Sequence, residues 1–494
     1  MFALATAAGA YFVLRYGGQW TESDSGLMSQ AIRLVANTRE LAPDTLGAYS
    51  NGYGYQAVSL AITAFTGLRV ETLQQVVYPL VSALLVLPAW ALYRELTGSA
   101  KAATLATLFL LIVPEHLFAV LRASHERLDR AFIMSALWLL IRLLRFREDR
   151  PRSAVHVALV VLMTYALVAT NILFGMSFVA ALVTALVMSR IAHRGPVKVR
   201  PFAVETTSVL RWAWAVAGVI VVVFVLFLYP PFETSFRILL GIPDRLLAII
   251  FSGGTSFDPY AYVQTAWVSG TAFLVLSSAN LVLLAVSVLI WFGYGISWLR
   301  GGRPASTGVW FLWLLYAAFA AQGAASIASD RTGSLSGNVQ LRAFAVFATV
   351  AAPLIAVAVS QWRPRPMLRR VSSVAFGLAM VVALTKASLD PAFAHKWLFY
   401  SRDEVAALQW ADTHDPDAAI WIGPDDRVQA AYAMEIGDPT FTYRLLAYEP
   451  DPTAIDAVLL SELVLVQSER LGIPLPPLGS RNLLYDNGEV QIYR

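Results

Sequence analysis

The chain has 494 residues, of which 57% are hydrophobic and only 14% are charged, and its mean hydropathy is +0.59. Soluble domains carry about 25% charged residues, so this composition excludes an ordinary cytosolic enzyme, a disordered protein and a nucleic-acid-binding protein. Cysteine is absent, which excludes a disulfide framework, a thiolate metal site and a cysteine nucleophile. The charge is uneven, since residues 391–494 hold 7 Lys/Arg and 16 Asp/Glu, whereas residues 1–390 hold 30 and 17. We therefore expect a basic membrane part, 1–390, followed by an acidic part, 391–494.

Apolar runs predict about eleven membrane-spanning helices, because one span needs roughly 20 apolar residues. They lie near 2–16, 73–93, 101–119, 131–146, 153–170, 172–190, 211–229, 270–298, 307–327, 342–361 and 371–387. With the N-terminus in the cytoplasm, the loops that follow even-numbered helices hold 18 of the 30 basic residues and only four acids. The positive-inside rule therefore predicts an integral protein of the cell membrane with a cytoplasmic N-terminus. It places loops 17–72, 120–130, 230–265 and 328–341 and the C-terminal part on the extracytoplasmic side.

The C-terminal residues 391–494 are expected to form a small extramembrane α/β domain. Ser401 with Glu404 predicts a capped helix, and Asp486-Asn487-Gly488 is a hairpin signal. Strands are expected at Ala418–Ile422, Ala457–Leu460, Leu463–Val466 and Val490–Tyr493. The predicted fold class is therefore mainly α, a polytopic helical bundle with this small domain after it.

The first outer loop begins with two acids, Glu22 and Asp24, directly after the first helix. An acid at the membrane rim can bind a divalent cation or act as a general base. The same residues also suit the start of a helix over about 24–40, with Ser23 or Asp24 as its N-cap. The local pattern leaves both interpretations open.

The second outer loop is dense in polar residues, since seven of the nine residues in 122–130 are polar. Such density at a membrane boundary is costly unless the groups pair or face water. On a helix, His125 and Asp129 share a face that suits one cation or a proton relay, with Glu126 beside them. The alternative is a helix start held by salt bridges.

Two arginines, Arg331 and Arg342, flank a short loop before the tenth helix. An arginine there can hold a lipid phosphate with two hydrogen bonds, or it can extend to the membrane interface without binding anything. The loop 230–265, with glycines near its centre, is either a mobile lid or a plain connector.

In the order of its parts the chain resembles the GT-C superfamily of polytopic glycosyltransferases. This superfamily includes protein mannosyltransferases, aminoarabinose transferases and the catalytic subunits of oligosaccharyltransferases, which use polyprenyl- or dolichyl-phosphate-linked sugars. The shared order is an acid after helix one, an amphipathic helix, a Tyr/Gly stretch, Gly67-Leu68, a helix pair, a second acidic outer loop, and a soluble outer domain. The resemblance covers the first 190 residues best and the tail moderately.

The resemblance implies roles for individual residues. Asp24 matches the first-loop acid that serves as catalytic base or metal ligand, with Glu22 as its neighbour, and Glu126 and Asp129 match the second-loop acids that help to hold the metal. Arg342, in Leu341-Arg342-Ala343-Phe344, resembles the arginine that meets the lipid-linked phosphate. The acceptor motif Trp-Trp-Asp-Tyr-Gly of oligosaccharyltransferases is missing, because the matching stretch, Ala418 to Asp426, has a different sequence. Asp258 or Gln264 stands where those enzymes have an acceptor-binding glutamate.

The resemblance thus implies an inverting, acid-assisted transfer of sugar from a polyprenyl- or dolichyl-phosphate donor to an extracytoplasmic glycan, lipid or protein acceptor. A divalent cation, Mg²⁺ or Mn²⁺, is expected at Asp24, Glu126, Asp129 and His125, and the lipid phosphate at Arg342 and Arg331. Two alternatives stay open, namely oligosaccharyltransferase-like transfer to protein, and a lipid-linked sugar flippase or transporter. Transporters need polar groups near the bilayer midplane, whereas here the polar residues gather at the outer rim.

Overall fold

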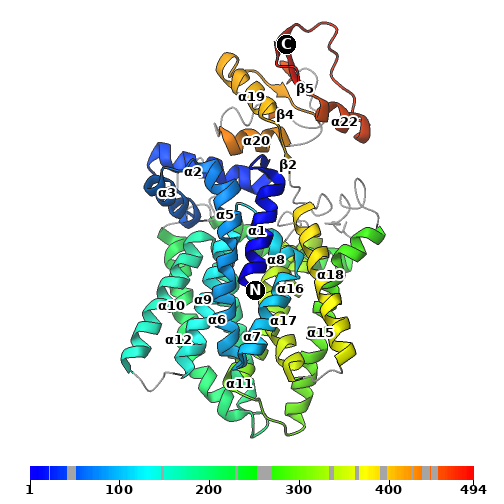
Figure 1. The fold of residues 1–494 in the computed structure, drawn as a ribbon. Coiled ribbons are helices and arrows are strands. Elements are labelled where there is room, and N and C mark those ends of the chain that lie inside the picture. Colours follow the sequence, from blue (N-terminus) through cyan, green and yellow to red (C-terminus); the bar gives the residue numbers. More distant parts are fainter. Residues whose placement is uncertain are drawn as a thin grey trace.

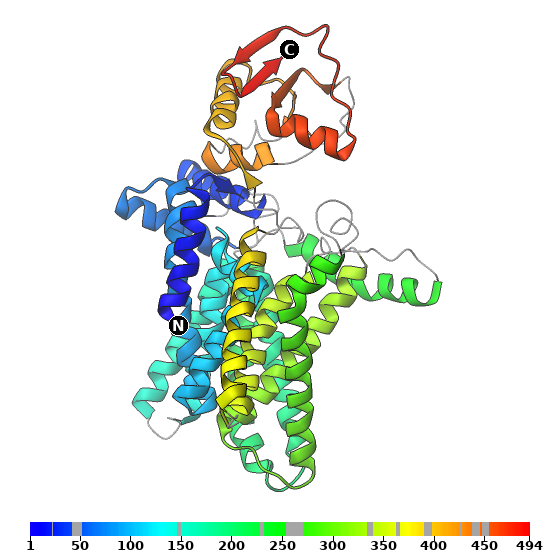
Figure 2. The same ribbon diagram turned by 45° about the vertical axis from the view of Figure 1, so that its right-hand side comes forward.

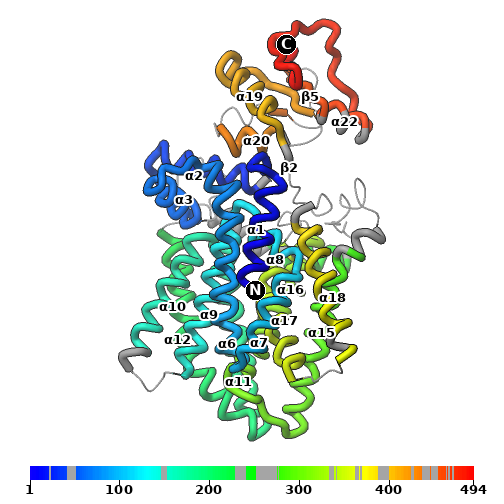
Figure 3. The backbone as a smooth tube through the Cα atoms, in the orientation of Figure 1, coloured from blue at the N-terminus to red at the C-terminus, as the bar shows by residue number. Residues whose placement is uncertain are grey.

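The computed structural model describes residues 1–21, 23–41, 52–145, 150–227, 232–252, 270–332, 339–361, 366–389, 398–423, 427–436, 445–446 and 454–494. Helices run side by side in one bundle, and the C-terminal strands lie beyond one end of it (Figures 1 and 2). We call this the outer end, in keeping with the predicted topology. The N-terminus lies at about mid-height on one side of the bundle (Figures 2 and 3), and the C-terminus lies far beyond the outer end.

The helices of the first half are α1 (Phe2–Tyr16), α2 (Ser23–Thr38), α3 (Gly54–Thr66), α4 (Val70–Thr72), the π-helix η2 (Leu73–Val77), α5 (Tyr78–Val81), the 3₁₀-helix η3 (Ser82–Leu85), α6 (Val86–Thr97), α7 (Ala100–Leu111), α8 (Pro114–Leu121), α9 (Glu126–Arg145), α10 (Arg150–Thr170), α11 (Ile172–Ala192) and α12 (Arg200–Phe227). They are followed by α13 (Phe232–Ser252), α15 (Gly270–Leu299), α16 (Thr307–Arg331), α17 (Val339–Gln361) and α18 (Pro366–Leu389). Each of the eleven apolar stretches is helical over its described residues, apart from the break at residues 112–113 between α7 and α8.

Within the described ranges, eight helices are long and apolar enough to cross a membrane, and α7 with α8, bent by 77°, would be a ninth span. The chain is therefore an integral membrane protein. Two of the eleven predicted spans do not meet this criterion. Helix α1 has 15 residues, or about 22 Å against a hydrocarbon core of about 30 Å, and α9 carries charged residues in its first and last turns.

The bundle is held together by a large apolar core. Its buried side chains come chiefly from α6, α7, α9, α11, α12, α16 and α17. Helices α15 and α16 add a tryptophan pair, Trp291 and Trp313, whose rings stack 4.8 Å apart. Each indole N–H donates to the other residue's backbone carbonyl oxygen at 3.0 Å. The site described below therefore lies on a packed scaffold.

Two expected loops contain helices. The first outer loop, 17–72, holds α2 and α3, which lie across the outer end of the bundle (Figure 1). The expected loop 230–265 contains α13, and its glycine-rich centre from 253 onward, with Asp258 and Gln264, lies outside the described residues. A lid in that loop therefore stays a prediction.

The C-terminal residues form a five-stranded sheet of order β4-β3-β5-β7-β6. Its strands are β3 (Ile420–Trp421), β4 (Leu445–Leu446), β5 (Ala457–Ser461), β6 (Leu483–Asp486) and β7 (Val490–Tyr493), and its helices are α19 (Arg402–His414), α20 (Arg427–Glu435) and α22 (Glu462–Leu471). Side chains from these elements make a separate apolar core. The expected boundary at 391 lies among residues that are not described.

The expected capped helix, the hairpin and three of the four expected strands, now β3, β5 and β7, are confirmed, and one strand is wrong. Ser401 and Glu404 form the expected capping box of α19, and β6 and β7 pair as the hairpin whose turn contains Gly488 at φ 93°. The segment Leu463–Val466 is not a strand but the start of α22. Ser461 caps that helix by accepting from the Val464 backbone N–H at 3.3 Å, and a short apolar run alone does not separate helix from strand.

Candidate active site

The first acid of the site, Asp24, lies in the first turn of α2. Helix α2 is pressed against α20, because a Cβ atom on Gly26 would stand 2.8 Å from the Ala430 carbonyl oxygen. Arg33, further along α2, donates to the Ala433 and Met434 carbonyl oxygens at 3.0 and 2.5 Å. The contact with α20 therefore fixes where Asp24 stands. Glu22 lies outside the described residues, so its predicted role is untested.

The second outer loop supplies an arginine whose side chain is only 1% exposed, Arg122. It follows α8 directly, and its guanidinium lies over the Phe118 ring, 5.4 Å from the ring centre. Its Nε donates to the Ser124 hydroxyl at 2.9 Å. These contacts hold the guanidinium in one place inside the protein.

Arg122 joins the two predicted loop acids. Its Nη2 lies 3.0 Å from Asp24 Oδ2 and 2.7 Å from Glu126 Oε1. A second arginine, Arg342 in the first turn of α17, also spans both acids, with Nη2 3.3 Å from Asp24 Oδ2 and Nε 3.4 Å from Glu126 Oε1. Arg130 Nη2 lies 3.2 Å from the other oxygen of Glu126. These five residues are called the arginine–carboxylate cluster below.

The cluster thus combines residues from α2, the loop before α9, α9 itself and α17. The sequence separations are large, 318 positions between Asp24 and Arg342. Of the residues predicted from sequence, the structure brings Asp24, Glu126 and Arg342 together. The residues that sequence reasoning did not single out are Arg122 and Arg130. Their signal was present, because each stands four positions from Glu126, the spacing of a helical ion pair.

The charge on Glu126 depends on these arginines. Burial alone would raise the pKa of Glu126, but the guanidinium groups around it outweigh this effect and lower that pKa to about 2. Burial also lowers the pKa of His125 to about 4. At neutral pH the site therefore holds an ionised Glu126 and an uncharged His125.

The other two expected metal ligands do not join the cluster. Asp129 is fully buried and, among the described residues, neither carboxylate oxygen has a hydrogen-bond partner. Burial, together with the charge of Glu126, raises the pKa of Asp129 well above its ordinary value. His125 caps α9 through its backbone oxygen, which accepts from the Asp129 N–H at 3.1 Å. Its Nε2 is buried with no partner in the described part of the chain.

These residues do not fit the expected divalent cation. In the described ranges, no group of three or more His, Asp or Glu side chains could hold a metal ion. The two acids that meet, Asp24 and Glu126, both contact one nitrogen of Arg122. The predicted ligand set of Asp24, Glu126, Asp129 and His125 is therefore not assembled.

The two predicted phosphate-binding arginines differ in position. Arg342 is in the cluster and its side chain is 30% exposed, so it can reach a ligand from outside. Arg331 is exposed at the end of α16 and is not in the cluster. Its neighbour Asp330 is buried and accepts from the backbone N–H groups of Val339 and Gln340 at 3.0 and 2.8 Å. This capping fixes the start of α17, three residues before Arg342.

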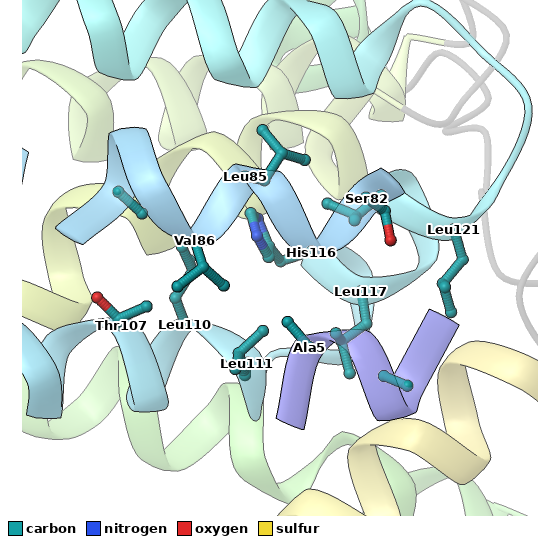
Figure 4. A pocket seen from close by; sticks show the side chains of 13 residues that line it. Ala5, Ser82, Leu85, Val86, Thr107, Leu110, Leu111, His116, Leu117 and Leu121 are labelled. Atoms are coloured by element: carbon teal, nitrogen blue, oxygen red, sulfur yellow. The ribbon is translucent and has the colours of Figure 1, made fainter. Parts of the chain in front are cut away.

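A small apolar pocket lies between α1, α6, α7 and α8 (Figure 4). Its lining includes Ala5, Val86, Leu110, Leu117 and Leu121, with His116 as the ionisable group. Leu121 immediately precedes Arg122 in the chain. The pocket therefore borders the segment that carries the cluster.

A second polar group lies between three helices. Lys386, in the last turn of α18, is buried, and its Nζ lies 2.8 Å from Glu115 Oε1 and 3.2 Å from the Ser277 hydroxyl. Asn280 donates to the other oxygen of Glu115. This pair links α8, α15 and α18. Glu115 is thus paired across helices and is not part of the cluster.

Comparison with models of protein families gives no match, and comparison with curated proteins gives none either. Solved structures do match. The chain aligns with the apo crystal structure of the oligosaccharyltransferase of Archaeoglobus fulgidus at 12% identity and a TM-score of 0.55, covering 93% of this chain and 69% of that one. The structure of the same enzyme tethered to an acceptor peptide with the NVT sequon aligns at 13% identity with a TM-score of 0.56, covering 93% of this chain and 68% of that one. The chain therefore has the same fold as this oligosaccharyltransferase.

Other structures score lower. ArnT from Cupriavidus metallidurans aligns at 15% identity with a TM-score of 0.41, covering 99% of this chain and 98% of that one. A complex of the Archaeoglobus enzyme with Zn and sulfate aligns at 14% with a TM-score of 0.48, covering 91% and 59%. The fold shared with the archaeal oligosaccharyltransferase, at TM-scores of 0.55 and 0.56, agrees with the resemblance seen in the sequence.

Proposed function

We propose that this protein is a membrane glycosyltransferase that moves a sugar from a polyprenyl- or dolichyl-phosphate donor to an extracytoplasmic acceptor. One observation carries the proposal. An acid from the first outer loop, Asp24, an acid from the second, Glu126, and an arginine from a late helix, Arg342, meet at the outer end of the bundle. The GT-C fold supports the same class of chemistry.

The chemistry follows from these groups. Asp24 would accept the proton of the acceptor hydroxyl, whose oxygen then bonds to the anomeric carbon as the bond from that carbon to the phosphate oxygen breaks. Attack opposite the leaving phosphate inverts the anomeric centre. The phosphate leaves with the lipid, and Arg342 can stabilise its charge with two hydrogen bonds. Arg331, which is exposed and shortly precedes Arg342 in the sequence, would help to attract the phosphate.

The location of the cluster suits such a reaction. The donor's lipid stays in the bilayer, while a glycan, lipid or protein acceptor comes from the water side. A site at the end of the helices serves both substrates. We therefore also propose the cell membrane as the location, a cytoplasmic N-terminus, and a C-terminal domain, 391–494, outside the cell.

Transfer to a protein sequon is the second candidate in this class, because the archaeal enzyme was solved with an acceptor peptide. The C-terminal residues of this chain argue for another acceptor. Trp421 stands in the stretch aligned by sequence with the missing acceptor motif, but it is 1% exposed and packs in the core of the sheet. It is therefore not available to a peptide.

A lipid-linked sugar transporter is the candidate from another class. The buried pair Glu115–Lys386 between helices is the observation that favours it, because charges inside membrane bundles often mark transport paths. Both charges are satisfied by each other and by neighbouring amide and hydroxyl groups, which favours a structural link.

Donor turnover separates these candidates. The purified protein would be incubated in detergent with a mixed pool of polyprenyl-linked sugars and acceptors, and the released lipid phosphate measured. We expect release of lipid monophosphate, whereas pyrophosphate would indicate an oligosaccharide donor. No consumption of any donor, together with movement of lipid-linked sugar across reconstituted liposomes, would refute the proposal in favour of a transporter.

A further inference from the structure

The most informative feature of the cluster is the position of Arg122. A single nitrogen, Nη2, contacts the acid of the first loop at 3.0 Å and the acid of the second at 2.7 Å. A divalent cation bridging these two oxygens would need the position between them. The arginine already fills that position, and it is locked there by the Phe118 ring and the Ser124 hydroxyl.

The charge of the cluster leads to the same conclusion. Three guanidinium groups meet two carboxylates, a net charge of +1. His125 adds no negative charge, and the Asp129 carboxylate forms no hydrogen bond to a described residue and is not among the paired acids. A dication would therefore enter a site that is already positive, with both of its acids engaged. The same excess positive charge attracts an anion such as a phosphate.

We propose that the Arg122 guanidinium replaces a divalent cation in this protein, so that sugar transfer proceeds without a metal ion. The inference rests on the proposed function and specifies how its site is charged. Arg122 acts as a positioning residue. Because it is buried, it does not touch the substrate, but it holds Asp24 beside Glu126 and supplies a fixed positive charge. Arg342, which is partly exposed, is the arginine that reaches the phosphate.

The roles of the two arginines are therefore different. When Arg342 turns toward a phosphate, Asp24 would lose that partner but keep Arg122. The acid then stays in place while the leaving phosphate gains a partner. A fixed guanidinium, unlike an exchangeable ion, needs no loading step.

The first test uses the wild-type protein. Donor turnover would be measured after removal of metals with EDTA and after addition of Mg²⁺ or Mn²⁺, and bound metal would be determined by elemental analysis. We expect turnover to stay within about twofold in all conditions and no stoichiometric divalent metal. Loss of turnover in EDTA that Mg²⁺ or Mn²⁺ restores would overturn the inference while leaving the glycosyltransferase proposal intact.

Binding of Mn²⁺, followed by electron paramagnetic resonance, gives a readout that does not depend on activity. We expect no Mn²⁺ to bind at the cluster, so Glu126→Gln should leave Mn²⁺ binding unchanged. A wild-type Mn²⁺ site that this variant removes would contradict the inference. The Mn²⁺ measurement tests the inference even if the protein turns over no donor. Absence of donor turnover would refute the proposed function, which is a separate result.

The second test replaces the arginine itself. We expect folded Arg122→Ala to lose about 10²-fold or more in turnover and to be stimulated by guanidinium or Mg²⁺, neither of which stimulates the wild type. Arg145→Ala, which removes a half-exposed partner of Glu95 at the other end of α9, is the matched control and should behave like wild type. A folded Arg122→Ala that keeps full turnover, or that neither cation stimulates, would overturn the inference. If the variant does not fold, the wild-type measurements decide.

Discussion

Two buried acids one helical turn apart, Glu126 and Asp129, are predicted to respond in opposite ways to the same change. Each would be replaced by its amide, as Glu126→Gln and Asp129→Asn. Glu126 contacts guanidinium groups at 2.7, 3.2 and 3.4 Å, whereas no hydrogen-bond partner is described for the Asp129 carboxylate oxygens. The amide removes the charge but keeps the shape in both cases.

Removing one member of a buried ion pair costs about 3–5 kcal/mol, because the partner charge stays buried. We therefore expect Glu126→Gln to lower the free energy of unfolding by about this amount. Burial raises the pKa of Asp129 and so favours its uncharged form. The amide resembles that form, and we expect Asp129→Asn to change stability by less than about 1 kcal/mol.

Unfolding in detergent at neutral pH, followed by tryptophan fluorescence, measures both effects. The pH dependence gives a second check on Glu126. Its pKa is lower in the folded state, so its contribution is fully present above its ordinary pKa of about 4.3. It is lost as the pH falls toward about 2, and the difference between wild type and Glu126→Gln should shrink over that range. Equal destabilisation by the two amides at neutral pH would refute the reasoning.

Three further predictions concern the scaffold and the donor. Lys386→Met and Glu115→Gln should each destabilise the protein, and the double variant should lose at least about 1 kcal/mol less than their sum in a double-mutant cycle; additivity would mean that the pair is not coupled. Gly26→Ala should cost about 1–3 kcal/mol and reduce turnover, because its Cβ atom meets a backbone carbonyl of α20 at 2.8 Å, whereas Gly377→Ala, in open space on α18, should not. Equal unfolding curves for these two variants would count against the docking of α2 on α20. Arg342→Ala should raise the KM for the donor by about tenfold or more, the loss of about 1.5–3 kcal/mol from a charged hydrogen bond, and an unchanged KM would remove Arg342 from the phosphate site.

Much of the fold could be predicted from the sequence because membrane helices are encoded locally. Apart from the break between α7 and α8, every apolar run expected to be helical is helical where it is described, since a run of about 20 apolar residues has few other stable states in a bilayer. The error at Leu463–Val466 arose where a short run is ambiguous and the cap at Ser461 decides. The number of membrane spans was harder to predict. Whether a helix crosses the membrane depends on its length and on the charges at its ends, as in α1 and α9, and not only on its apolar residues.

The site could be predicted only in part, because a local sequence pattern shows single residues but not the contacts between distant segments. Asp24 and Glu126 were found because acids at a membrane boundary are conspicuous. The contact of Asp24 and Glu126 with the same Arg122 could not be predicted, because it depends on how α2 packs against the end of α8. Only the packed structure shows that Asp129, three residues from Glu126, is left out of the arginine–carboxylate cluster.

The central claim is that Asp24 takes the acceptor's proton during sugar transfer. The most direct measurement compares acceptor-dependent donor turnover by Asp24→Asn with that by Asp417→Asn, an exposed aspartate of the C-terminal part. We predict that Asp24→Asn loses about 10²-fold or more, the usual contribution of a general base, while it still binds donor through Arg342, and that Asp417→Asn matches wild type. Wild-type turnover by Asp24→Asn would contradict the claim.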